Sequence, residues 1–458
     1  MSQALDPLLA PLPEDRPPVR RCARIPAGFL AAGTRAGIKA SDRQDFALVV
    51  AERDAVPAAA VFTPNRLAAA PVRLTRANLQ ATGGTNASAG YAKAIVATSG
   101  SANAATGPGG DADQAAIGVA VAVALGSIPE RVMHLSTGVI GVRLPVDRVT
   151  AEVARVAGTL LAATDEALES AAVSLRTTDS TTKMASVTVT SPGADGGMTE
   201  ITVTGIAKGV GMIHPRMATM LSIVLTDATA SPGTLSTLLR AAAATTWDQL
   251  SVDGDTSTND TVILLASGAA GAASADTDPA ARASLVAALD AVARDLARQQ
   301  ARDGEGATAL ITCQVTGAAD DVDARAVARA VIGSPLVKAA IHGKDANWGR
   351  IAGAAGNAVS AEAAVLEAAG LSPETAAERA NRPATVDPAR LRIAIAGHLA
   401  YDGAAGGPAG IDKAAARTAM TAEEVLIRLD LGLGAGTGEA FGCPLTEGYV
   451  KENSEYTT

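Results

Sequence analysis

The chain has 458 residues, of which 48% are hydrophobic but only 2% aromatic, so Ala, Val, Leu and Ile must fill most of its interior. This length allows two or more domains with a large core. The net charge of -9 and the lack of a basic cluster argue against a nucleic-acid-binding protein. Three cysteines without a Cys-x-x-Cys pair fit a reducing cytoplasm better than a disulfide framework or a zinc site. Because eighteen continuous apolar residues occur nowhere, we expect no membrane-spanning helix.

The first 21 residues contain several prolines and mixed charges, and we expect them to form a mobile N-terminal extension. Beyond them, short apolar runs bounded by Pro, Gly or charged residues predict strands. Ala- and Val-rich stretches with helical spacing predict helices. In the first half of the chain the predicted strands cover residues 45–51, 58–63, 94–98 and 199–204, and the predicted helices cover residues 111–126 and 147–163.

The second half contains one long predicted helix, from Pro279 to Arg302, which begins with the favourable capping pair Asp278-Pro279. Strands and helices interleave without strict alternation, which predicts a mixed α/β or α+β layered fold rather than a doubly wound sheet. Predicted strands cover residues 220–225, 261–266, 309–316, 392–396 and 425–431, and residues 268–276 and 375–388 are predicted to be surface loops.

Common cofactor motifs do not occur in this sequence. Gly343-Lys344 is followed by Asp345 rather than Ser or Thr, so it is not a Walker motif. The glycines of residues 432–438 do not fit the dinucleotide-binding fingerprint. The histidines do not form a metal-binding pair at helical spacing and are interpreted as structural or surface residues; they are His134, His214, His342 and His398. The sequence therefore contains no recognised motif for a nucleotide or a metal ion.

The segment of residues 208–221 is the most informative part of the chain. Glycines at 209 and 211 precede Ala218-Thr219, and a strand-like apolar run follows directly. Cleavage before Thr219 would give an N-terminal threonine, whose α-amine, with a reference pKa of roughly 7.7–8.0, can serve as base for its own hydroxyl. Taken alone, the same residues equally fit a threonine that begins an ordinary buried strand.

Nine segments, in matching order, resemble signature segments of the ornithine acetyltransferase family, the bifunctional glutamate N-acetyltransferases of arginine biosynthesis. The resemblance extends over nearly the whole chain. The segments are residues 25–29 with 36–39, 99–107, 136–141, 177–179, 208–221, 252–260, 303–306, 347–350 and 453–458.

This resemblance implies a layered αββα-like sandwich, with the nucleophile at the start of a buried strand and a smaller C-terminal α/β domain. It implies cleavage between Ala218 and Thr219, which gives an alpha chain ending at 218 and a beta chain of residues 219–458. Residues 219–330 would complete the catalytic core, and residues 331–458 would form the smaller domain. Two alpha and two beta chains would make a heterotetramer.

The activity that the resemblance implies is a ping-pong acetyl transfer in the cytoplasm. N-acetylornithine gives its acetyl group to the threonine and leaves as ornithine, and glutamate then takes the acetyl group to become N-acetylglutamate. Three alternatives remain open: acetyl-CoA as a second acetyl donor, a secondary-metabolism paralogue with another acceptor, and an aminopeptidase or amidase with the same type of nucleophile.

The resemblance also assigns residues. Thr219 is expected to be the nucleophile, and the Thr137 hydroxyl with the Gly138 N–H is expected to form the oxyanion hole. The sequence departs from the family pattern at Ser101, Ala105, residues 180–183, His214 and Pro444, which leaves donor and acceptor preference open. The expected substrate-binding residues are Thr177, Lys208, Thr219, Glu305, Asn453 and Thr458.

Overall fold

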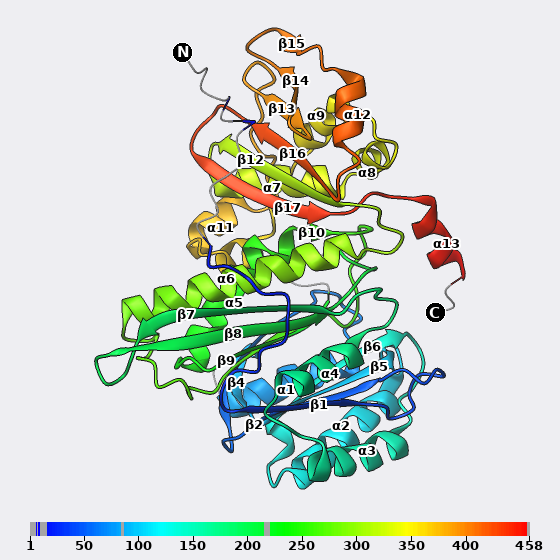
Figure 1. Ribbon diagram of the computed structural model, residues 1–458, viewed down its shortest axis with the longest axis vertical. Helices are drawn as coiled ribbons and strands as arrows, with labels where there is room; N and C mark the ends of the chain where they lie inside the picture. Colours follow the sequence, from blue (N-terminus) through cyan, green and yellow to red (C-terminus); the bar gives the residue numbers. More distant parts are fainter. Residues whose placement is uncertain (1–5, 7, 10–15, 84–86, 215–219, 456–458) are drawn as a thin grey trace.

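The computed structural model describes residues 6, 8–9, 16–83, 87–214 and 220–455, which form three stacked β-sheets with helices between and around them (Figure 1). The predicted cleavage residues Ala218 and Thr219 and the predicted substrate-binding residue Thr458 lie outside the described residues.

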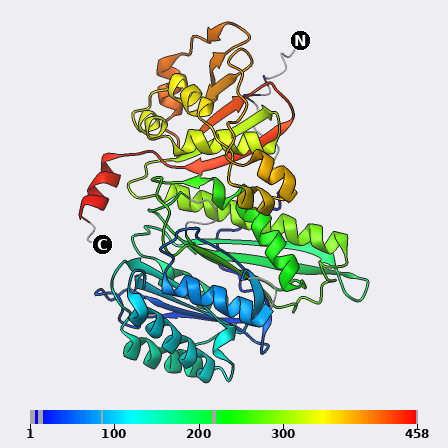
Figure 2. The same ribbon diagram turned by 180° about the vertical axis from the view of Figure 1, so that it is seen from behind.

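The first sheet has four strands in the order β1-β2-β5-β6, and only its β5–β6 pair is parallel. Helices α2 and α3 cover one face, and α1 and α4 lie against the other, between this sheet and the second one (Figure 2). The bounds are β1 Phe29–Thr34, β2 Phe46–Ala51, β5 Ala94–Ser101, β6 Val132–Val139, α1 Ala70–Gly83, α2 Gly107–Ala124, α3 Val146–Thr159 and α4 Asp165–Leu175, with a short 3-10 helix at Pro129–Arg131.

The second sheet has six strands in the order β4-β3-β11-β9-β8-β7. Its central strand β9 is buried at all six residues, runs parallel to β11 and pairs antiparallel with β8. Helices α5 and α6 cover the face that points away from the first sheet. The bounds are β3 Val56–Phe62, β4 Ala89–Ala92, β7 Lys183–Pro192, β8 Met198–Lys208, β9 Leu221–Thr226, β11 Thr261–Ala266, α5 Pro232–Thr245 and α6 Pro279–Arg302.

The third sheet has seven strands in the order β10-β17-β12-β16-β13-β14-β15. Its strands are β10 Leu250–Ser251, β12 Leu310–Ala318, β13 Arg392–Ile395, β14 His398–Asp402, β15 Gly407–Pro408, β16 Glu424–Asp430 and β17 Gly436–Gly442. The helices of this part are the 3-10 turn Trp247–Gln249, α7 Asp321–Gly333, α8 Pro335–His342, α9 Trp348–Gly356, α10 Ala363–Ala368, α11 Pro373–Arg379, α12 Lys413–Ala419 and α13 Glu447–Glu455.

The core contains few aromatic rings, as the composition predicted. Phe29, Phe46, Trp247 and Phe441 are fully buried, and the clusters around them consist mainly of Ala, Val, Leu and Ile. One cluster fills the space between the first two sheets, and another joins the second sheet to α5 and α6. Small and branched aliphatic side chains therefore take the place of aromatic rings in the space between the layers.

The predicted mixed α/β class and layering are confirmed, and the structure adds α1 and α4 between the two sheets. The predicted bounds of α6 and β11 match those observed. The loop predicted at residues 375–388 is wrong at its start, because Ser372 caps α11, which continues to Arg379. The domain division at residue 331 stays a prediction; β12, which precedes it, already belongs to the third sheet.

Most of the predicted N-terminal extension lies outside the described residues. Of the part that is described, Arg20 pairs with Ser186 of β7, and Arg16 forms an ion pair with Asp290 of α6. Within the described ranges, none of the helices combines the length and apolar character that crossing a membrane requires.

The packing of α6 against the second sheet predicts a difference between two substitutions on that helix. Leu289 is 1% exposed, whereas Val286 is 42% exposed. We expect Leu289→Ala to lower the free energy of unfolding by about 2–5 kcal/mol, because it leaves a cavity. Val286→Ala should change it by about 0.5 kcal/mol or less. Urea unfolding followed by circular dichroism measures both, and equal effects would contradict the packing described here.

Candidate functional site

A cavity of about 140 Å³ brings together all six predicted site residues that the structure describes. They come from separate parts of the fold, where several elements end. Thr137 and Gly138 belong to the end of β6, Lys208 ends β8, Thr177 follows α4, Glu305 follows α6, and Asn453 lies on α13. Thr137 and Asn453 are 316 positions apart in sequence, and such distant residues are not expected to share one small cavity by chance, so this cavity is the candidate active site.

The end of β6 is shaped by a close approach to β5. Gly138 has φ 131°, and a Cβ atom there would lie 2.4 Å from the backbone carbon of Gly100. Only glycine therefore fits this position. The register of the parallel β5–β6 pair shifts at the same point, between Gly100 and Ser101. Both Thr137 and Gly138 belong to the last part of β6.

Lys208 reaches across the cavity to the same strand end. Its Nζ donates a hydrogen bond of 2.9 Å to Oγ1 of Thr137, which is 7% exposed. Since the ammonium occupies an acceptor site of that oxygen, the Thr137 hydroxyl hydrogen is left to be donated elsewhere. Burial lowers the pKa of Lys208, and the nearby Asp179 carboxylate opposes this shift.

Glu305 presents a carboxylate to the same cavity. Oε1 accepts a hydrogen bond of 3.0 Å from Thr178 Oγ1, and Oε2 accepts one of 2.9 Å from Asn453 Nδ2. The Glu305 N–H donates to the Val210 carbonyl at 2.8 Å. A Cβ atom on Gly211 would lie 2.3 Å from Oε2, so the absence of a side chain there gives the carboxylate its room.

Thr177 occupies the loop between α4 and β7. Its N–H donates to Oδ2 of Asp179 at 2.9 Å, and its carbonyl accepts from Arg43 at 3.1 Å. The cavity thus has a cation, a carboxylate and hydroxyl groups on its walls. Such a set can bind a small zwitterionic molecule in one orientation.

Sequence reasoning assigned no role to several residues of the cavity. Asn259 is one: its Nδ2 donates to the carbonyls of Ala102 at 2.6 Å and Ser136 at 2.8 Å, and so ties the ends of β5 and β6 together. Asn259 falls within the segment of residues 252–260, which resembles a family signature segment, but the resemblance assigned no role to this residue. The unassigned lining residues are Ala102, Ile140, Thr178, Val210, Gly211, Met212, Ser257, Thr258 and Asn259.

Asp260, the last residue of this segment, is 2% exposed, and its carboxyl group interacts electrostatically with Lys208. Burial raises the pKa of its carboxyl group well above the ordinary value, and Ser257 and Lys208 oppose the shift. Its Oδ2 is buried and accepts no hydrogen bond from the part of the chain that the structure describes. Next to the lining residue Asn259 there is therefore a buried carboxyl group that takes up a proton more readily than an ordinary aspartate.

A larger cavity, of about 440 Å³, lies along α7, with further lining residues from α10 and from the connection that follows α9. None of the predicted site residues lines it among those the structure describes. The smaller cavity is the better candidate because it combines convergent charged and polar groups with the predicted oxyanion residues.

Comparison with known proteins identifies the family. The sequence model of the ArgJ family matches residues 30–458. The arginine biosynthesis bifunctional protein ArgJ of Thermosynechococcus vestitus is 42% identical over 433 residues, covering 94% of this chain and 96% of that protein. The protein of the same name from Thermus thermophilus is 41% identical over 437 residues, covering 95% and 99%.

Two solved structures are also similar. The crystal structure of the bifunctional protein ArgJ of Bacillus halodurans is 40% identical and covers 52% of this chain and 100% of that chain, with a TM-score of 0.45. The ornithine acetyltransferase of Mycobacterium tuberculosis, solved in complex with ornithine, is 39% identical and covers 44% and 99%, with a TM-score of 0.38. From the family match and the full-length relatives, the chain belongs to the ArgJ family.

Proposed function

We propose that this protein transfers the acetyl group of N2-acetyl-L-ornithine to L-glutamate through an acetyl-threonine intermediate. The observation that carries the proposal is that an ammonium, of Lys208, and a carboxylate, of Glu305, both line one cavity that Thr137 and Gly138 also line. Membership of the ArgJ family, whose full-length relatives are named arginine biosynthesis bifunctional proteins, supports it.

The two charged residues suit the two ends of the donor. Lys208 can pair with the α-carboxylate, as an ammonium does with carboxylates elsewhere. Glu305, held by Thr178 and Asn453, can accept hydrogen bonds from the terminal ammonium of the ornithine side chain. Thr177 and Thr458 are proposed to make the remaining polar contacts. Contacts at both charged ends of the donor would hold its acetyl group in one position.

The proposed chemistry has two halves. The α-amine of Thr219 takes the hydroxyl proton while the hydroxyl oxygen attacks the acetyl carbonyl. The resulting oxyanion accepts hydrogen bonds from the Thr137 hydroxyl and the Gly138 N–H. Collapse breaks the amide bond, ornithine leaves with the proton, and an ester remains on Thr219. The α-amine of glutamate then attacks that ester by the reverse steps and leaves as N-acetylglutamate.

The same proposal covers assembly and donors. Cleavage at Ala218–Thr219 would put β8 in the alpha chain and β9 in the beta chain, and these strands are hydrogen-bonded neighbours over six residue pairs. The two chains are therefore expected to stay together, and two such pairs would form the heterotetramer. We propose no metal and no organic cofactor, with acetyl-CoA as a second acetyl donor and the cytoplasm as the location.

Substitution of the proposed nucleophile tests the proposal directly. We expect Thr219→Ala to remain a single 458-residue chain and to lose acetyl transfer, because both the cut and the ester need the hydroxyl. Mass spectrometry of the purified protein detects the fragment that begins at Thr219. The exposed Thr237 of α5 provides the control, since Thr237→Ala should be cleaved and active. Transfer by uncleaved Thr219→Ala would refute the mechanism.

In the wild type, acetate release from N-acetylornithine that glutamate does not suppress would favour the amidase alternative.

The proposed contact between Glu305 and the ornithine side chain predicts that a change at Glu305 affects the KM values of the two substrates differently. Glu305→Gln removes the negative charge but keeps the size of the side chain. We expect the KM for N-acetylornithine to rise on the order of tenfold or more, because a charge-assisted hydrogen bond is lost. The KM for glutamate, which has no terminal ammonium, should change less. Initial-rate kinetics with each substrate varied measures both constants, and an equal rise would contradict this role of Glu305.

The lowered pKa of Lys208 predicts a pH dependence of donor binding. A lysine whose pKa is lowered by burial carries its charge below that pKa and loses it as the pH rises through it. We therefore expect the KM for N-acetylornithine to rise at alkaline pH, before an ordinary lysine would deprotonate. Lys208→Met should have a raised KM without this alkaline rise. Initial rates between pH 7 and 10 measure the profile, roughly the range set by the reference lysine pKa.

A further inference from the structure

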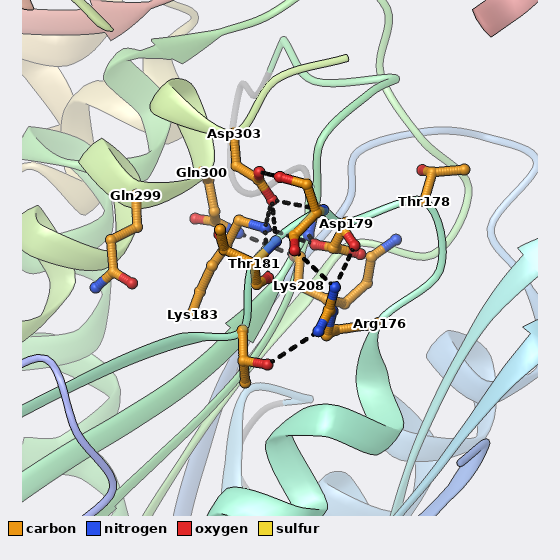
Figure 3. A network of polar contacts seen from close by, with 12 residues as sticks. Arg176, Thr178, Asp179, Thr181, Lys183, Lys208, Gln299, Gln300 and Asp303 are labelled. Atoms are coloured by element: carbon orange, nitrogen blue, oxygen red, sulfur yellow. Dashed lines mark hydrogen bonds and ion pairs between the residues drawn. The ribbon is translucent and has the colours of Figure 1, made fainter. Parts of the chain in front are cut away.

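Lys183, at the start of β7, has an ammonium group that is fully buried between two carboxylates. Its Nζ lies 2.7 Å from Oδ1 of Asp179 and 2.6 Å from Oδ2 of Asp303, and its side chain is 0% exposed (Figure 3). Neither the sequence pattern nor the proposed reaction gives Lys183 a role. A buried ammonium is costly unless its partners are well placed, so its position is not accidental.

Asp179 connects Lys183 to two walls of the cavity. Its Oδ2 accepts the N–H of Thr177 at 2.9 Å, and its Oδ1 accepts the N–H of Gly209 at 2.8 Å. Burial raises the pKa of Asp179, but Lys183, Lys208 and the Gly209 N–H outweigh it and hold the pKa below its ordinary value. The charged carboxylate therefore fixes the backbone beside Thr177 and the backbone that follows Lys208.

Asp303 connects Lys183 to the third wall. It accepts the N–H groups of Ser180 and Thr181 at 3.1 and 3.2 Å and directly precedes Gly304-Glu305. One turn earlier on α6, Gln300 Nε2 donates to the carbonyl of Lys208 at 3.0 Å. The end of α6 thus holds both the loop after α4 and the end of β8 (Figure 3).

These contacts make Lys183 the common link of three segments that are far apart in sequence. The segments carry Thr177, Lys208 and Glu305, which all line the candidate cavity. We propose that Lys183 is a positioning residue for the acetyl donor, which holds these three substrate-binding side chains in register without touching the substrate. This inference rests on the proposed function, because the donor is the molecule that those three side chains would bind.

An ordinary structural ion pair would be expected to support the whole fold, and not one group of substrate contacts. The network differs from that in its connections: Asp179 accepts the N–H groups of Thr177 and Gly209, and Asp303 accepts the N–H groups of Ser180 and Thr181 and the Ser180 hydroxyl. These groups belong to, or directly adjoin, the segments that carry the substrate-binding side chains. In the described part of the chain, no direct contact joins Lys183, Asp179 or Asp303 to the proposed oxyanion residues on β6. Thr137 is linked to them one step further on, through the hydrogen bond that Lys208 donates to it. Loss of Lys183 should therefore impair donor binding more than attack by the nucleophile.

Lys183→Met tests the inference, because it keeps the length of the side chain and removes the charge. Two donors are compared on the cleaved, soluble protein: N-acetylornithine, which uses all three side chains, and p-nitrophenyl acetate, which has neither a carboxylate nor an ammonium group. We expect kcat/KM for N-acetylornithine to fall about 10- to 100-fold, mainly through KM, as for a small misplacement of binding groups. Acylation by p-nitrophenyl acetate should stay within about threefold of the wild type.

Arg294 provides the matched control. It forms a mostly buried ion pair with Glu439 from the same helix that leads to Asp303, but it does not line the cavity. Arg294→Met should leave the ratio of the two donor activities unchanged. The double variant K183M/D303N removes opposite charges together and serves if the single variant does not accumulate; it should show the same selective loss.

The outcomes separate the two proposals. A selective loss with N-acetylornithine supports positioning by Lys183. Equal losses with both donors, or no loss with either, would overturn it and leave Lys183 with a structural role. If the wild type is acylated by p-nitrophenyl acetate but does not transfer acetyl from N-acetylornithine to glutamate, the proposed function is wrong, and the inference about this donor is wrong with it.

Discussion

The antiparallel pairing of β8 with β9 is the interaction on which the site depends. It pairs six residues, from Val203 opposite Thr226 to Lys208 opposite Leu221, in the middle of the second sheet. Because a register slip of one residue would turn every side chain to the other face, this buried ladder fixes Lys208 beside the start of β9. The predicted cleavage site lies in the connection between these strands. The same hydrogen bonds that build the sheet would therefore hold the two products of cleavage together.

Charge organises the cavity around that ladder. Lys208 lies among the carboxyl groups of Asp179, Asp260 and Glu305, which favour its charge, whereas burial and the nearby ammonium of Lys183 disfavour it and lower its pKa. Its hydrogen bond to Thr137 also polarises that hydroxyl, since hydrogen bonds in a chain strengthen one another at low dielectric. If Lys208 binds the donor as proposed, this one lysine would couple donor binding to the proposed oxyanion hole. A donor carboxylate that draws Lys208 toward itself would act on both.

The sequence predicted those parts of the fold where one pattern runs long or stays uniform. α6 was predicted because its helical spacing and Asp278-Pro279 cap agree, and β11 because all six of its residues are apolar or small. β7 was not predicted, since Lys183 and several Thr and Ser residues interrupt its apolar pattern. The site residues came from the family resemblance. Periodicity could not show that Lys183, in what reads as a polar turn, is fully buried, because its carboxylate partner Asp303 lies 120 residues away.

Carboxylates also accept hydrogen bonds from the backbone that precedes the predicted cleavage site in sequence. Gly209 has φ 141° and Met212 has φ 54°, a region that costs a residue with a side chain about 1–3 kcal/mol. Asp179 accepts the Gly209 N–H, and Asp253 accepts those of Met212 and Ile213. Burial raises the pKa of Asp253, whereas the lysines lower that of Asp179, so acid acts on Asp253 first. Residues 209–213 are therefore held at both ends, and Asp179, which contacts the backbone that follows Lys208, also fixes the first part of the connection in which the predicted cleavage site lies.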